Sequence, residues 1–155
     1  MNKKISIILV FLWMIVIFMF SNQPSDTSSK YSNGFTRNLV VFINKLQNKT
    51  LSEKELNLKI DKYHIVIRKL AHLTEYLILG ILVMNLLINY NIELKRLLLI
   101  SLIICILYAC SDEIHQLFIK GRSGQPLDVL IDTIGSTLGI AIYYIINKKK
   151  LKLRT

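Results

Sequence analysis

Long apolar runs alternate with polar segments along this chain. The runs cover residues 5–20, 70–89, 97–111 and 127–147. A helix needs about 20 residues to cross the hydrocarbon core of a bilayer, with a range of roughly 17–25. The shorter runs reach that length once flanking residues are added. We therefore predict an all-α, polytopic membrane protein, a bundle of four transmembrane helices. Their expected bounds are about 5–21, 70–89, 97–113 and 127–147.

Composition supports a membrane protein and one domain. Hydrophobic residues make up 52% of the chain, and its mean hydropathy is positive. The formal net charge of +10 would suggest nucleic-acid binding in a soluble chain, but no basic repeat is interleaved with aromatic residues. Basic residues that flank membrane helices contact anionic headgroups instead. We expect membrane lipids as partners, no nucleic acid, and a single domain over residues 1–155; the oligomeric state stays open.

The polar segment between the first two runs is predicted to contain helices outside the membrane core. Residues 21–33 are rich in Ser, Asn and Asp and predict a loop, with Ser25 or Asp26 able to cap the next helix. Apolar residues then recur at helical spacing, which predicts an amphipathic helix on the membrane surface or on the bundle. They are Phe35, Leu39, Phe42, Ile43 and Leu46. A further helix starts at Ser52 and can run through Lys62 towards the second apolar run.

Charge asymmetry across the apolar runs predicts the orientation of the bundle. Basic residues at the ends that we assign to the cytoplasm are Lys3, Lys4, Lys95, Arg96, Lys148, Lys149, Lys150, Lys152 and Arg154. The acidic residues Asp26, Asp112 and Glu113 lie at the opposite ends of these runs. The positive-inside rule then places both termini in the cytoplasm and the polar stretches outside. The second run is ambiguous, because Arg68 and Lys69 precede its outer end.

One polar stretch opens the second apolar run. Arg68, His72 and Glu75 follow one another at spacings of four and three residues, so on a helix they share a face. Lys69 and Tyr76 flank that face. Charged groups at a membrane boundary are energetically unfavourable unless they form ion pairs, contact water or take part in a function. We therefore predict that this stretch is one half of a functional site.

The other half is predicted to be the stretch from Tyr108 to the start of the fourth apolar run. Its candidate acid–base groups are Asp112, Glu113, His115, Asp128 and Asp132, and its candidate ligand-binding groups are Gln116 and Arg122. Gly135 and Gly139 follow the two aspartates on the same side of the fourth helix, in a small-xxx-small pattern that allows close approach of another helix. We expect this face to pack against the second helix, beside His72.

Each of these polar residues also has a structural interpretation. Glu75 can be an ion-pair partner of Arg68 or Arg122, and His72 can be a neutral, hydrogen-bonded histidine between helices. Asp132 lies about a turn and a half inside an apolar run, where a bare carboxylate is unfavourable by a few kcal/mol. Either a structural partner or a functional role would account for it.

The sequence contains no recognisable metal or cofactor signature. The spacings His-x-x-Glu and Glu-x-His match no standard zinc site, and no phosphate-binding loop or cofactor fingerprint is present. We therefore assign no metal and no cofactor. Cys105 and Cys110 are five residues apart on different sides of a helix, which favours packing over a disulfide. Gly121 and Gly124 predict a turn, whatever the function.

The polar motifs occur in a fixed order over about residues 15–145. They are Phe20-Ser21-Asn22-Gln23-Pro24, Arg68-Lys69-x-x-His72-x-x-Glu75-Tyr76, Ser111-Asp112-Glu113-x-His115-Gln116, Gly121-Arg122 and Asp128-x-x-x-Asp132-x-x-Gly135. This combination resembles the VanZ-like family of small multi-pass membrane proteins. The resemblance implies a cell-membrane location and a role in the cell envelope, such as low-level resistance to teicoplanin. It supplies no reaction.

Three functions remain open at this point. Cations beside acid–base groups at the outer headgroup level indicate a phosphate ligand, because a guanidinium binds phosphate through two parallel hydrogen bonds. We favour an envelope factor that binds an anionic lipid or lipid-linked phosphate and limits access of teicoplanin or cationic antimicrobial compounds. The alternative is a membrane enzyme acting on a lipid phosphate, with His72 or His115 as general acid or base. In the third interpretation, the charges only hold the helices together.

Overall fold

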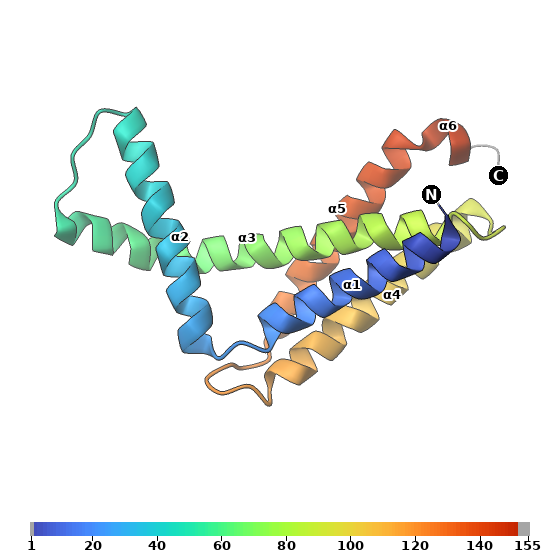
Figure 1. The fold of residues 1–155 in the computed structure, drawn as a ribbon, viewed down its shortest axis with the longest axis horizontal. Helices are drawn as coiled ribbons and strands as arrows, with labels where there is room; N and C mark the ends of the chain where they lie inside the picture. Colours follow the sequence, from blue (N-terminus) through green and yellow to red (C-terminus); the bar gives the residue numbers. More distant parts are fainter. Residues whose placement is uncertain (1, 152–155) are drawn as a thin grey trace.

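The protein is described by a computed structural model over residues 2–151 of the chain, and this part contains helices and no strand. The helices are α1 (Lys3–Ser21), α2 (Ser25–Leu46), α3 (Glu53–Leu87), α4 (Leu94–Gln116), α5 (Pro126–Ile146) and α6 (Lys148–Leu151). Four of them, α1, α3, α4 and α5, are long and apolar enough to cross a membrane. The predicted all-α, multi-pass fold is confirmed. In Figure 1, α1 begins and α5 ends at the same end of the bundle, beside the loop between α3 and α4.

The longest element, α3, has 35 residues and no proline or glycine before Gly80. At 1.5 Å per residue it is about 50 Å long, against about 30 Å for a hydrocarbon core. The helix expected from Ser52 therefore continues into the second membrane span without a break. Its start is fixed by a capping box, in which the Glu55 N–H donates to Ser52 Oγ and the Ser52 N–H donates to Glu55 Oε2. Figure 1 shows the N-terminal part of α3 extending beyond the bundle, where α2 crosses it.

The loop predicted for residues 21–33 is wrong, because α2 begins at Ser25. Neither Ser25 nor Asp26 caps it; the N-cap residue is Pro24, and no side chain makes a cap hydrogen bond. Composition is misleading here because Ser and Asp favour the first turn of a helix as well as loops. Tertiary packing then stabilises the whole of α2, since helix propagation from a packed segment is cooperative.

One face of α2 is buried against α3, and its apolar face is exposed. The buried row consists of Thr36, Val40 and Asn44, and it packs against the N-terminal part of α3. The apolar row that defined the predicted amphipathic helix is instead exposed, with Phe35 at 61%, Phe42 at 58% and Leu46 at 69%. The helix thus packs on α3 through one row and leaves its apolar row uncovered by the rest of the described chain.

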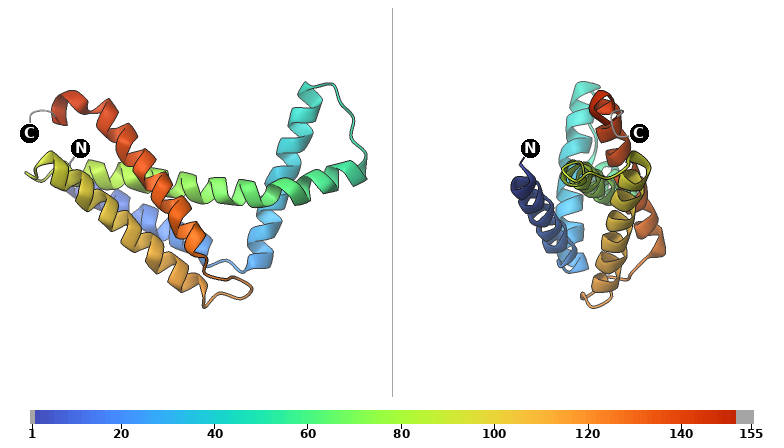
Figure 2. Two further views of the ribbon diagram at one scale, coloured as in Figure 1. Left: turned by 180° about the vertical axis from the view of Figure 1, so that it is seen from behind. Right: turned by 90° about the vertical axis from the view of Figure 1, so that its right-hand side faces the viewer.

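Close packing between α3 and α5 follows from glycines on α5. A Cβ atom at Gly135 would collide with the main-chain oxygen of Leu73, and one at Gly139 with that of Leu77. The small-xxx-small prediction is confirmed, and the partner helix is α3. In the left view of Figure 2, which is seen from behind, α5 crosses in front of α3. This crossing brings the aspartates of α5 to the polar face of α3.

Aromatic side chains tie α1 to the rest of the bundle. The indole N–H of Trp13 donates to the main-chain oxygen of Glu75 at 2.8 Å, and the hydroxyl of Tyr108 donates to that of Met14 at 2.6 Å. Cys105 is buried and Cys110 is half-buried, and both are free thiols. The hydrogen bonds at Trp13 and Met14 hold the middle of α1 against α3 and α4.

Candidate functional site

A small polar cavity of about 60 Å³ lies where the α1–α2 linker and the α4–α5 loop meet the middle of α3. Five of the predicted site residues line this cavity: Arg68, His72, Gln116, Arg122 and Asp128. Residues Ser25, Gly121, Ser123 and Gln125 complete it. The structure therefore brings side chains of both polar stretches to one place, together with the start of α2.

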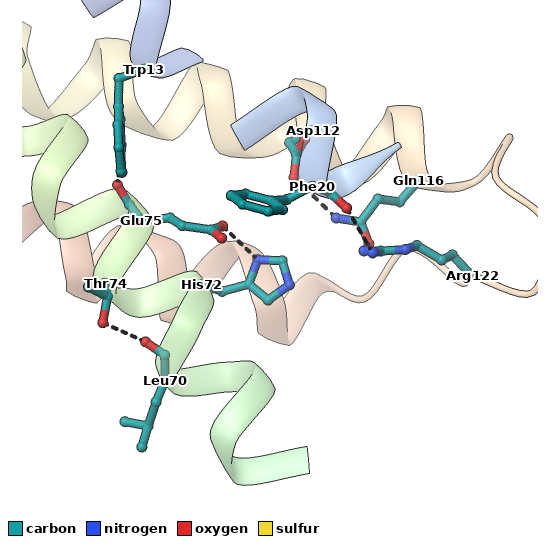
Figure 3. A network of polar contacts seen from close by, with 9 residues as sticks. All are labelled: Trp13, Phe20, Leu70, His72, Thr74, Glu75, Asp112, Gln116 and Arg122. Atoms are coloured by element: carbon teal, nitrogen blue, oxygen red, sulfur yellow. Dashed lines mark hydrogen bonds and ion pairs between the residues drawn. The ribbon is translucent and has the colours of Figure 1, made fainter. Parts of the chain in front are cut away.

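Arg122 holds three parts of the protein together. Its Nε donates to the Gln23 main-chain oxygen at 2.8 Å, and one terminal nitrogen donates to the Phe20 main-chain oxygen at 3.1 Å. The other terminal nitrogen donates to Gln116 Oε1 at 3.1 Å (Figure 3). Burial, with Arg68 nearby, lowers the pKa of the Arg122 guanidinium, which still stays protonated at physiological pH. Each terminal nitrogen keeps a second N–H for a ligand.

Gln116 links this guanidinium to a carboxylate. Its Nε2 donates to Asp112 Oδ2 at 3.1 Å, so Arg122, Gln116 and Asp112 form a continuous chain of hydrogen bonds (Figure 3). Gln116 and Asp112 are both buried, in the last turns of α4. Asp112 Oδ1 has no hydrogen-bond partner among the described residues.

Arg68 supplies a further cation to the cavity wall. Its half-buried side chain forms no hydrogen bond or ion pair with any residue between 2 and 151. The ion pair considered between Glu75 and Arg68 or Arg122 is absent within that range; Glu75 Oε2 lies 3.7 Å from His72 Nδ1 instead. An unpaired guanidinium on a polar cavity wall is a site for an anion.

His72 and Glu75 form a mostly buried pair at the inner wall. Figure 3 shows the imidazole between Glu75 and the Gln116–Arg122 pair. His72 Nδ1 is buried and makes no hydrogen bond within the described chain, since its 3.7 Å approach to Glu75 is longer than a hydrogen bond. An imidazole backed by a carboxylate and lining a cavity can act as a general acid or base.

Lys69 and Asp128 neutralise each other across the α3–α5 contact. Lys69 Nζ lies 2.7 Å from Asp128 Oδ1, and both side chains are largely buried. Asp128 therefore lines the cavity as half of an ion pair. The positive charges of Arg68 and Arg122 are left without a carboxylate partner within 4 Å in the described chain.

A second group of carboxylates lies deeper in the bundle. Asp132 is 0% exposed, and neither of its carboxylate oxygens has a hydrogen-bond partner in the described range. The hydroxyl of Tyr76 is likewise buried without a partner among residues 2–151. Glu113 differs, because its Oε2 accepts a hydrogen bond from the Gln125 N–H at 2.8 Å and so ties α4 to the start of α5. Buried polar atoms without a partner call for a ligand, water or another explanation.

Seven of the predicted site residues are outside the cavity lining: Lys69, Glu75, Tyr76, Asp112, Glu113, His115 and Asp132. Two of these, His115 and Tyr76, have other structural contacts. The His115 ring stacks on Phe18, with ring centroids 4.6 Å apart, and its Nε2 hydrogen-bonds with Asn22 Oδ1 at 3.2 Å. His115 thus belongs to the contact between α1 and α4. Tyr76 packs within the bundle core beside Tyr108, behind the cavity. A chemical role for His115 at the cavity has no geometric support.

A sequence model of the VanZ/LLP1 family matches residues 6–147, which include every element that lines the cavity. The chain belongs to the VanZ/LLP1 family. The predicted resemblance to VanZ-like proteins is thereby confirmed over nearly the whole sequence. Neither the curated proteins nor the solved structures compared with this chain gave a match. Chemistry of this VanZ/LLP1 member must therefore be inferred from its own side chains.

Besides Gly121, which the sequence predicts only as part of a turn, three cavity residues of the VanZ/LLP1 chain are not predicted from the sequence as site residues. They are Ser25, Ser123 and Gln125. Ser25 begins α2 and Gln125 is the N-cap residue of α5, so two helix N-termini reach the cavity, and neither N-cap residue makes a side-chain cap bond. In the sequence, Pro24 and Pro126 could have indicated the two helix starts that bring Ser25 and Gln125 to the cavity. Helix N-termini carry partial positive charge and free N–H groups.

The acidic residues of this VanZ/LLP1 bundle do not group as metal ligands. Among residues 2–151, no three His, Cys, Asp or Glu side chains are placed to hold one metal ion. Arg68, Arg122 and the ion-paired Asp128 line the cavity, and the other predicted carboxylates do not.

Proposed function

We propose that this protein binds the phosphate of an anionic lipid, or of a lipid-linked phosphate, in the polar cavity at the extracytoplasmic face of the cell membrane. The unpaired guanidinium of Arg68 on the cavity wall is the observation that carries this proposal. Arg122 adds a second positive charge with N–H groups to spare. Asp128, the one carboxylate in the described cavity lining, pairs with Lys69 and forms no ion pair with either guanidinium.

The helix N-termini support an anion rather than a cation as ligand. Both α2 and α5 begin at the cavity, so the partial positive charge of two helix N-termini lies beside it, although the Ser25 N–H already donates to the Lys120 main-chain oxygen and Pro126 has no N–H. A volume of about 60 Å³ can hold a few waters or one group of phosphate size, since a single water needs only about 10–15 Å³. The cavity is thus suited to a headgroup phosphate, not to a whole drug-sized molecule.

The depth of the cavity favours a lipid as the source of the phosphate. It lies at the middle of α3, where this helix leaves the four-helix bundle. That is the headgroup level when the bundle spans the hydrocarbon core. The charge asymmetry of the sequence favours an outside location for this end of the bundle, with both termini in the cytoplasm. Binding or masking outer-leaflet anionic lipid would lower access of teicoplanin or cationic antimicrobial compounds.

The test compares two arginine variants of the full-length protein. Arg68→Gln should lower copurifying anionic lipid, measured by native mass spectrometry, about ten- to a hundredfold, because a hydrogen bond to a charged group contributes about 1.5–3 kcal/mol. Arg37→Gln is the matched control, since Arg37 on α2 is exposed and pairs with Glu53 at the start of α3, away from the cavity lining. Susceptibility to teicoplanin and to a cationic peptide is measured in parallel. Equal lipid retention in both variants would refute the proposal.

The His72–Glu75 pair supports one alternative, a membrane enzyme that acts on the bound lipid phosphate. Here His72 would transfer a proton at the phosphate while Glu75 orients its ring. Purified protein with a phospholipid or a polyprenyl phosphate should then form a product over time. His72→Gln should abolish turnover and leave lipid binding intact. No product with either lipid would exclude this alternative and leave the binding function.

A further inference from the structure

An apolar groove of about 430 Å³ lies on the outer side of α4 and α5, directly beside the polar cavity. Its apolar lining includes Cys110, Ile114, Leu117, Pro126 and Val129. Ile114 is 59% exposed and Leu117 is 60% exposed, although both belong to or follow a membrane-spanning helix. Apolar side chains exposed on a membrane span contact hydrocarbon. The groove is therefore a depression in the lipid-facing surface of the bundle.

Gln125 lines both the groove and the polar cavity, so the two are neighbours across the α4–α5 loop. The loop is held in place by the hydrogen bond from the Gln125 N–H to Glu113 Oε2. Gly124 lets the loop lie close to α4, because a Cβ atom there would be 2.9 Å from the Leu117 side chain and 3.0 Å from the Glu113 main-chain oxygen. Only the α4–α5 loop, at Gln125, therefore lies between the polar cavity and the apolar groove.

A second apolar groove, of about 310 Å³, lies between α2 and α3. It contains Ile67, but it shares no lining residue with the polar cavity. The α4–α5 groove, in contrast, adjoins the cavity through Gln125. A molecule that occupies both the α4–α5 groove and the cavity must be polar at one end and hydrocarbon at the other.

We propose that the α4–α5 groove binds the hydrocarbon chain of the same lipid whose anionic headgroup occupies the polar cavity. This rests on the proposed function and defines its ligand as an amphiphile that enters sideways from the membrane. A soluble phosphate would gain only the contacts to Arg68 and the helix N-termini. A lipid gains these contacts and the groove, which lies in the size range of ligand pockets, roughly 300–1,000 Å³.

The test fills the groove from either helix with a larger side chain. Cys110→Phe on α4 and Val129→Phe on α5 are made in the full-length protein, and each should lower bound phosphatidylglycerol at least about tenfold in native mass spectrometry. Ile103→Phe is the matched control, seven residues before Cys110 on the same face of α4, exposed and outside the groove. It should bind as much lipid as the unaltered protein. Glycerol 3-phosphate, which has a headgroup phosphate and no chain, should bind all three variants equally by saturation-transfer NMR.

Two further measurements separate this inference from the proposed function. Arg68→Gln should weaken both phosphatidylglycerol and glycerol 3-phosphate; if it weakens neither, the proposed function and this inference both fail. If Arg68→Gln weakens both ligands while Cys110→Phe and Val129→Phe retain full lipid binding, the cavity stands and the groove is refuted. With the unaltered protein, binding should increase from short-chain to long-chain phosphatidylglycerol. Equal binding across chain lengths would likewise refute the groove, without relying on any variant.

Discussion

Lys69 on α3 and Asp128 on α5 form an ion pair with 2.7 Å between Nζ and Oδ1, next to the cavity wall that carries Arg68 and His72. This contact fixes the relative position of α3 and α5, which carry the cavity residues Arg68, His72 and Asp128. It also means that substitutions of Asp128 act on packing and on local charge together.

The Lys69–Asp128 pair should be measurable as a coupling energy. Lys69→Met and Asp128→Asn should each lower the stability of the detergent-purified protein by about 1–3 kcal/mol, because each leaves a largely buried partner unsatisfied. The double variant should lose clearly less than the sum of the two. Thermal unfolding followed by circular dichroism provides the values, and strict additivity would show that the pair contributes nothing.

Arg122 is expected to matter for stability as well as for binding. Arg122→Lys cannot keep the hydrogen bonds to Gln23, Phe20 and Gln116 at once, so the end of α1 should loosen. We expect a loss of about 2–4 kcal/mol in unfolding free energy, with each bond to a charged group contributing about 1.5–3 kcal/mol before compensation. Lys120→Arg, at an exposed position in the same loop, is the control and should leave the melting temperature unchanged.

The glycine contacts between α3 and α5 should tolerate no added methyl group. Gly139→Ala places a Cβ atom against the Leu77 main-chain oxygen, which cannot move aside as a side chain can. Overpacking of this kind costs about 1–3 kcal/mol. The amount of folded protein in the membrane should fall, whereas Leu138→Ala at a neighbouring exposed position should have little effect. Normal levels of Gly139→Ala would show that α3 and α5 are not in close contact at this position.

Orientation can be tested by cysteine labelling in a Cys105→Ser, Cys110→Ser background. Exposed Ser123 lies in the loop at the cavity, exposed Lys49 lies between α2 and α3, and exposed Asn91 lies in the loop between α3 and α4. Cysteines at Lys49 and Ser123 should react with a membrane-impermeant maleimide in intact cells, and one at Asn91 should react only after lysis. The reverse pattern would place the cavity in the cytoplasm and remove the proposed access to the outer leaflet.

Periodicity predicts the parts of the site that depend on one helix. The shared face of Arg68, His72 and Glu75 follows from helical spacing, and His72 with Arg68 does line the cavity. The glycines of α5 likewise predict a close helix contact from their spacing alone. These features are local, since each needs only the geometry of a single helix.

Features that depend on contacts between distant segments could not be predicted. The hydrogen bonds of Arg122 reach residues 99 and 102 positions earlier in the chain, and no local pattern reports them. The start of α2 escapes prediction because Ser-rich composition is shared by loops and by first turns of helices. Its place in the polar stretch after the third apolar run assigns His115 to the site, but on α4 its ring contacts the end of α1.

The unbroken length of α3 has a mechanical consequence. A helix without proline or glycine between Glu53 and Leu79 behaves as a stiff rod, and Arg68 and His72 lie near its midpoint. Its N-terminal half packs against α2, whose exposed row with Phe35 and Phe42 can rest on a bilayer surface. Thinning or bending of the membrane that shifts α2 would then tilt α3 as one unit and move Arg68 and His72 with it.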